Sequence, residues 1–447
     1  MRPPIFWNYC LNCYNLTMIK KFLNNKLYAN SLIFFIASLL GAFGNYAFHF
    51  LMARLLSPSS YGELQSLISL SVIFGIPVGV LSVVIAKYTA EFKAKNENHQ
   101  ISWLFKIFTK KLFFLGLIFF LLLLLAAPFI SNFLALKSLS SLIILIVSFI
   151  FVFLAALNNS VLQGLEKFKA LSAISIITVI LKIFLAFILI KLSLAVSGAV
   201  LAFVLAGLIA YGLTFIPLRF LIKSMPLSSL ESAQSPIKQM LNFSVPVLLI
   251  ILFTTLLYNL DILLVKHFFD SAVAGQYAAL ALLGHIIFFL IGPLIAVMFP
   301  AAAAAHASSI STNLIFKKSF LMSFFVGIIT LAFYFTFPAL IIKIIVGANY
   351  LELAPYLGWF GTAMFLFSLI SLLSQYFLSI SKTRFTYILF IAVFCQTALI
   401  SIWHASLWQI VWIMNGVMAV CLAGLAVYYT KTLNRYDFCH HSNPKSH

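Results

Sequence analysis

Charged residues are scarce in this chain. Of its 447 residues, only 8% are Asp, Glu, Lys or Arg, whereas 63% are hydrophobic. A soluble domain carries about 25% charged residues, so this composition excludes a fold whose surface mostly faces water. Extended polar regions are also lacking, because apolar runs of about 20 residues follow one another with short charged turns between them. This pattern predicts an all-α integral membrane protein.

The motifs of common ATPases and membrane enzymes are missing. The sequence contains no Gly-x-x-x-x-Gly-Lys-Ser/Thr phosphate loop, no Asp-x-Asp pair, no His-Glu-x-x-His and no Gly-x-Ser-x-Gly. The turns expected on the outer side are too short to hold a catalytic domain. We therefore expect a protein that is not an enzyme and that uses no cofactor.

Cysteine is rare as well, with five in the whole chain. Cys10 and Cys13 have the spacing of half a zinc site, and Cys439 is followed by two histidines at the other end of the chain. Both groups fall in segments expected to be cytoplasmic, where thiols stay reduced. We interpret them as ordinary tail residues and expect no metal site.

What the chain does contain is enough apolar sequence for twelve transmembrane helices. Together they occupy nearly the whole chain. The predicted spans are 28–51, 63–86, 112–131, 139–157, 171–191, 195–216, 242–266, 276–303, 319–341, 353–379, 385–402 and 408–429.

The basic residues indicate the orientation of these spans. With the N-terminus placed in the cytoplasm, 22 of the 28 Lys and Arg residues fall in cytoplasmic segments, five fall in outer turns and Lys182 lies inside a span. This is the positive-inside distribution, and it predicts a multi-pass protein of the plasma membrane with both termini in the cytoplasm. Because topology explains the net charge of +19, we expect no nucleic-acid partner.

The two halves of the chain repeat one another weakly. Arg54 and Lys266 lie 212 residues apart, and Gly62 and Gly275 lie 213 apart, each pair near the outer end of a predicted span. Since each half holds an even number of spans, both halves enter the membrane in the same sense, and a pseudo-two-fold axis along the membrane normal would relate them. The sequence thus predicts two six-helix lobes that face one another across a central cleft.

These lobes imply a simple domain plan. The expected segments are a cytoplasmic N-terminal segment (1–27), a first lobe (28–222), a cytoplasmic linker (223–241), a second lobe (242–430) and a cytoplasmic tail (431–447).

Two charged residues deep in predicted spans are the leading site candidates. Lys182 lies about 16 Å into its span, where a charged side chain costs about 2.5–3.5 kcal/mol and should face protein or water. It could serve as a cation for an anionic substrate, or form a structural polar contact. Asp261 lies about 28 Å along its helix. It is a candidate ion-coupling residue or the partner of Lys182 across the cleft.

Further candidates surround these two. Asn45 and His49 are four residues apart and share a helix face, and Tyr258 lies on the same side of its span as Asp261. Arg54 and Lys266 could line the outer mouth of the cleft, or anchor their helices at the membrane boundary. We predict substrate binding by Lys182, Arg54, Lys266, Asn45, His49 and Tyr258.

Prolines interrupt two corresponding spans. Pro77 lies between two glycines in the second span, and Pro293 follows Gly292 in the eighth. Helices broken at matching places in two halves are typical of a transporter binding site. We therefore predict helix breaks at Pro77 and Pro293.

Several of these residues fall in motifs that resemble a known family. The chain is similar, over about residues 28–430, to the polysaccharide-biosynthesis (O-antigen flippase-like) transporters of the multidrug/oligosaccharidyl-lipid/polysaccharide exporter superfamily. The residues that carry the resemblance are Asn45-Tyr46, Arg54-Leu-Leu-Ser-Pro58-x-x-Tyr61-Gly62, Lys87-Tyr-Thr-Ala-Glu91, and Asp261 followed by Gly275-x-Tyr277.

The resemblance implies an activity. It implies that a polyprenyl-diphosphate-linked oligosaccharide is moved by alternating access for cell-surface polysaccharide synthesis, with basic cavity residues receiving the diphosphate. Lys182 is the one Lys or Arg deep in a predicted span, so the cationic cavity would be sparse. Expected partners are the lipid-linked oligosaccharide, membrane lipid, a polysaccharide polymerase and glycosyltransferases.

Two alternatives remain open at this point. The same fold could act as an ion-coupled multidrug or cation antiporter, which would favour acidic and aromatic groups in the cleft. The chain could also be a non-transporting membrane enzyme or scaffold of the cell envelope.

Overall fold

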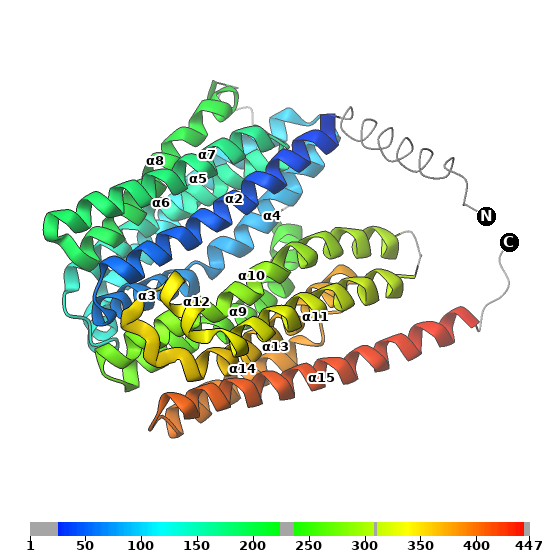
Figure 1. The fold of residues 1–447 in the computed structure, drawn as a ribbon. Helices are drawn as coiled ribbons and strands as arrows, with labels where there is room; N and C mark the ends of the chain where they lie inside the picture. The colour runs from blue at the N-terminus through cyan, green and yellow to red at the C-terminus, as the bar shows by residue number, and fades with distance from the viewer. Residues whose placement is uncertain (1–25, 224–236, 308–310, 442–447) are drawn as a thin grey trace, which may run out of the picture.

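The chain folds into long helices that form two groups (Figure 1). The computed structural model describes residues 26–223, 237–307 and 311–441. Helices predominate because a backbone surrounded by lipid has to satisfy its polar groups internally. The elements of the first half are α2 (Lys26–Leu55), α3 (Pro58–Phe74), α4 (Ile76–Ala94), α5 (Asn98–Phe133), α6 (Leu139–Gly164), α7 (Phe168–Leu189), a π-helical turn η1 (Ile190–Leu194) and α8 (Ala195–Lys223).

The second half follows the same plan. By length and composition alone, eight of the described helical segments could cross a membrane, or nine when the bent pair α3 and α4 counts as one span. Each of the twelve predicted spans coincides with one helix or with two successive helices, so the prediction of a twelve-helix membrane protein is confirmed. The elements are α9 (Ile237–Phe268), α10 (Ser271–Ala307), α11 (Asn313–Thr336), α12 (Pro338–Ile345), a 3-10 helix η3 (Ala348–Leu353), α13 (Ala354–Ser379), α14 (Thr386–Ile402) and α15 (Leu407–His441).

The packing of the helices shows the two-lobe arrangement. In the first lobe α2 packs on α7, α4 and α5 pack on α6, and α8 packs on both α6 and α7. In the second lobe α9 packs on α14, α10 and α11 pack on α13, and α15 packs on both α13 and α14. The two sets of contacts correspond helix by helix, as expected for two related halves. The lobes meet through α3 and α4 on one side and α9 and α10 on the other.

The predicted domain limits fall partly outside the described residues. Helix α8 ends at Lys223 and α9 begins at Ile237, so most of the expected linker 223–241 is not described, and the limits stay predictions. Cys10 and Cys13 also lie outside the described residues.

One of the two predicted proline breaks is present. The second span bends by 45° where α3 ends and α4 begins, at Gly75, and Pro77 occupies the first turn of α4. Proline suits that position because its missing N–H would have no partner there in any case. The prediction for Pro293 was wrong, since α10 continues through Pro293 and Pro300 without interruption. Packing in a membrane bundle allows a proline to remain within a continuous helix.

The lobes approach one another closely where α3 and α10 cross near their N-termini. A Cβ atom built on Gly62 would lie 2.7 Å from the Cα of Gly275, and one built on Gly275 would lie 1.8 Å from the carbonyl oxygen of Pro58. Small residues let helix backbones approach this closely in lipid, where burial of apolar surface gives little driving force for association. The repeated glycines of the sequence therefore meet each other at the contact between the lobes.

This crossing predicts a large effect of one methyl group. We expect Gly275→Ala to lower the thermal unfolding temperature of the purified protein, because overpacking costs about 1–3 kcal/mol and the obstructing atom belongs to the backbone. Gly212→Ala is the matched control, since no atom lies within 4 Å of a Cβ built there. Equal unfolding temperatures for the two variants would contradict the close crossing.

Candidate functional site

A cavity of about 520 Å³ lies on the face of the second lobe that meets the first lobe, with Val72 of the first lobe at its edge. Hydroxyl, amide and aromatic side chains line it, and none of the described lining residues is charged. The lining residues are Val72 of α3; Thr254, Thr255, Tyr258 and Asn259 of α9; Phe288, Gly292, Ile295, Ala296 and Phe299 of α10; and Phe367, Ser371, Ser374 and Gln375 of α13.

Tyr258 contributes an aromatic wall to this cavity. Its ring stacks on His285, with centroids 3.9 Å apart, and lies 5.3 Å from the ring of Phe367. Ser374 Oγ is buried without a hydrogen-bond partner among the described residues. The cavity thus offers flat apolar faces together with hydrogen-bonding groups, a combination that suits a polar, uncharged ligand. Of the predicted substrate-binding residues, Tyr258 is the one that lines it.

Lys182 lies inside the first lobe. Its side chain is 6% exposed, its Nζ donates a hydrogen bond to Asn45 Oδ1, and it lies 4.6 Å from the centroid of the Phe48 ring. These contacts join α7 to α2 and keep the ammonium away from lipid, as its charge requires. Lys182 does not line the cavity described above. Its geometry is that of a structural polar contact, and a role in substrate binding stays a prediction.

Two buried histidines lie beside these groups. His49 of α2 follows Phe48, whose ring lies against Lys182, and His285 of α10 stacks on Tyr258 at the cavity. His49 Nδ1 and His285 Nε2 are both buried and have no hydrogen-bond partner among the described residues. His49 does not line the cavity, and its role in substrate binding stays a prediction.

Asp261 is enclosed within the second lobe. It is 0% exposed, and its Oδ2 accepts a hydrogen bond of 2.7 Å from the Tyr277 hydroxyl. The proposed pairing with Lys182 was wrong, because each of the two charges has its partner within its own lobe. Asp261 Oδ1 is buried without a hydrogen-bond partner among the described residues. An oxygen in this state can accept a proton or a small cation.

Arg54 connects the lobes at the ends of the helices near the α3–α10 crossing. Its Nη2 donates to the carbonyl oxygens of Lys343 and Ile344 at the end of α12. These are the unsatisfied C-terminal carbonyls of a helix, where a cation is favourable. Arg54 is therefore a contact between the lobes and does not line the cavity.

His267 makes the corresponding contact from the other lobe. Its Nδ1 donates to the carbonyl oxygen of Phe133 at the end of α5 over 2.7 Å, and the two rings stack with centroids 4.0 Å apart. His267 lies 213 residues after Arg54, the same interval that separates the two crossing glycines. The sequence comparison paired Arg54 with Lys266, one residue away. Lys266 instead donates to Ser271 Oγ over 2.9 Å.

Comparison with known protein families identifies the family of this chain. The sequence profile of a family described as "Polysaccharide biosynthesis protein" matches residues 51–355, about two thirds of the chain. The chain belongs to this polysaccharide biosynthesis family. No curated protein sequence matches it closely enough to count as a relative.

Solved transporters share the fold of this polysaccharide biosynthesis protein. It is similar to an inward-facing multidrug resistance MATE family transporter of the MOP superfamily, with a TM-score of 0.76 and 14% identity over 90% of this chain and 96% of that one. The lipid II flippase MurJ, in an inward closed conformation, has a TM-score of 0.69 and 16% sequence identity, covering 89% of this chain and 87% of that one. An outward-facing MATE family transporter has a TM-score of 0.63 and 15% identity, covering 91% of this chain and 95% of that one. At these identities the likeness establishes the fold.

Loss of the Arg54 contact or of the His267 contact should make the α3–α10 crossing more accessible from outside. Ser59 lies at the start of α3 with its Oγ buried, so a Ser59→Cys variant can report access. We expect Arg54→Ala or His267→Ala to speed its modification by a membrane-impermeant thiol reagent several-fold, because each removes a hydrogen bond between the lobes. Lys191→Ala, which removes a cation near Phe187 of the same lobe, should leave the rate unchanged. Equal rates in all variants would contradict the contacts.

Proposed function

We propose that this membrane protein translocates a polyprenyl-diphosphate-linked oligosaccharide across the plasma membrane by alternating access, without acting as an enzyme, and with both termini in the cytoplasm. The neutral cavity between the lobes carries the proposal. Sugars present many hydroxyl groups and flat apolar faces, and the cavity offers Thr254, Asn259 and Ser371 beside the ring of Tyr258. The family description and the fold shared with a lipid II flippase also support this function.

The cavity favours the sugar part of the cargo over its diphosphate. No described lining residue is basic, so the cationic cavity that the family resemblance implied is absent from the described part of the site. Moving one negative charge out of a negative cytoplasm is favourable by about 2.3 kcal/mol per 100 mV. Membrane potential can thus help to drive the diphosphate outward, while the cavity shields the sugar from hydrocarbon.

An antiporter for cationic drugs is the competing function. Such a substrate would be expected to meet a carboxylate in the cavity, and the described lining contains none. Asp261 is enclosed against Tyr277. Reconstituted vesicles separate the two functions: we expect movement of lipid-linked oligosaccharide, whereas extrusion of a cationic dye without movement of the oligosaccharide would favour the antiporter.

The cavity hydroxyls give a direct test of sugar binding. We expect Thr254→Val to raise the KM for lipid-linked oligosaccharide about fivefold, because a neutral hydrogen bond contributes about 1 kcal/mol. Thr330→Val on α11 is a matched control, since both hydroxyls donate to the carbonyl four residues before them and Thr330 lies outside the cavity. Identical KM values for both variants would remove Thr254 from the binding site.

Asp261 is proposed as the ion-coupling residue. Asp261→Asn retains an oxygen that can accept from Tyr277 but removes the charge. In vesicles with a sodium or proton gradient and no membrane potential, we expect this variant to lose gradient-driven transport and to keep potential-driven transport. Gradient dependence equal to that of the wild type would show that coupling lies elsewhere.

A further inference from the structure

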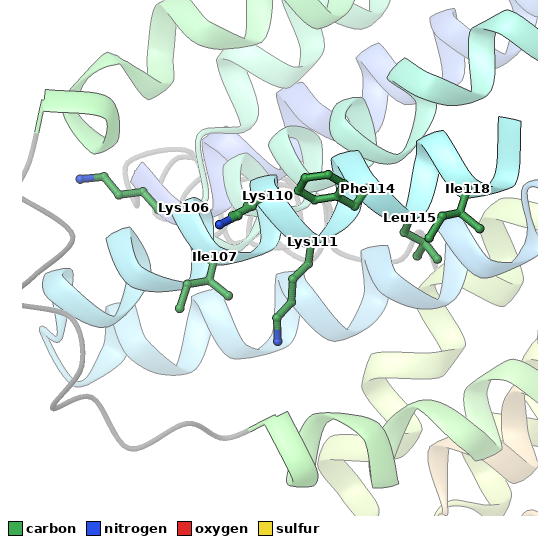
Figure 2. A pocket seen from close by; sticks show the side chains of 7 residues that line it. All are labelled: Lys106, Ile107, Lys110, Lys111, Phe114, Leu115 and Ile118. Atoms are coloured by element: carbon green, nitrogen blue, oxygen red, sulfur yellow. The ribbon is translucent and has the colours of Figure 1, made fainter. Parts of the chain in front are cut away.

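A second cavity lies on the outer surface of the first lobe. It is a groove of about 520 Å³ along α5, with Lys106, Lys110 and Lys111 at one end and Phe114, Leu115 and Ile118 further along the same helix (Figure 2). The described lining contains no carboxylate. The groove is thus basic at one end and apolar at the other.

The position of the groove matches the boundary of the membrane. The predicted apolar span begins directly after Lys111, on the side of the membrane where α2 and α5 begin. Ile118 lies twelve residues after Lys106, about 18 Å along the helix axis. Phe114 and Ile118 are 52% and 55% exposed. The apolar part therefore reaches into one leaflet, and the lysines remain at the depth of the headgroups.

The charges of two of these lysines are not compensated by nearby acids. The described salt bridges of the first lobe join Lys87 to Glu91 and Lys93 to Glu166. Within the described part of the chain, Lys110 and Lys111 form no ion pair, and both are exposed. Two adjacent cations above an apolar groove attract a ligand with an anionic head and a hydrocarbon tail.

We propose that this groove binds an anionic glycerophospholipid of that leaflet. The phosphate contacts Lys110 and Lys111, with Lys106 beside them, and one acyl chain lies along Phe114, Leu115 and Ile118. Basic clusters at the membrane boundary are favourable for anionic lipid by about 1 kcal/mol per lysine.

The position of α5 favours this occupant over the transported cargo. Helix α5 packs mainly on α6, whereas α3, α4, α9 and α10 form the contact between the lobes. The transport cavity is lined by α3, α9, α10 and α13. The groove is thus separate from both, and it faces lipid that surrounds the first lobe.

The test is a titration with phosphatidylglycerol followed by native mass spectrometry of the full chain. Each lysine is worth about fivefold in affinity, so we expect Lys110→Gln with Lys111→Gln to bind roughly 30-fold more weakly. The matched control is Lys317→Gln with Lys318→Gln, an adjacent exposed pair near the start of α11, the counterpart of α5 in the second lobe. It should bind as the wild type does. Unchanged unfolding temperatures without lipid would show that both variants are folded.

Three outcomes would overturn the proposal. The first is wild-type affinity in the Lys110 and Lys111 variant, and the second is an equal loss in the Lys317 and Lys318 control, which would indicate a general effect of surface charge. The third is phosphatidylcholine binding to the wild type as tightly as phosphatidylglycerol, since phosphatidylcholine carries no net negative charge. Glycerol 3-phosphate should bind far more weakly than the intact lipid, because it lacks the chain that occupies the groove.

Discussion

The close contact of two helix backbones at Gly62 and Gly275 is the constraint on which the arrangement of the lobes depends. A side chain on either residue would overlap the backbone of the opposite helix, so α3 and α10 can meet here only without one. Arg54 and His267 make corresponding contacts between the lobes: Arg54 donates to carbonyls at the end of α12, and His267 donates to the carbonyl of Phe133 at the end of α5. The lobes are thus held together at one end, and the neutral cavity lies further along the same helices.

The two charged residues deep in predicted spans, Lys182 and Asp261, have their partners inside their own lobes. Lys182 is paired with Asn45, and Asp261 with Tyr277, so neither charge lies in the cavity. A buried charge in lipid is stable only with such partners. The consequence is a cavity whose described lining is neutral and polar, which a sugar can enter without competing for an ion pair. His285 stacks on Tyr258 at the wall of this cavity.

The sequence predicted those features that depend on periodicity and repetition. Apolar runs gave the twelve spans, and the recurrence of Gly62 at Gly275 indicated equivalent positions that the structure brings into contact. Features that depend on rotation about a helix axis were less accessible. Lys182 was predicted to face protein or water, but the sequence did not indicate that Asn45 is its hydrogen-bond partner. Arg54 was matched to Lys266 when its counterpart is the neighbouring His267. Pro293 was expected to break its helix because it matches Pro77 in the first half. The sequence alone does not show which prolines lie within a continuous helix, as Pro293 does in α10.

The distance between the two lobes, measured at both ends of their helices, tests the account most directly. In a cysteine-free background, spin labels at Lys191 and Asn349 report one end, and labels at Lys169 and Arg384 report the other; all four side chains are exposed. We expect the lipid-linked oligosaccharide to lengthen the first distance and shorten the second, because alternating access has to open the lobes on one side of the membrane and close them on the other. Transport of the oligosaccharide with both distances unchanged would contradict the account.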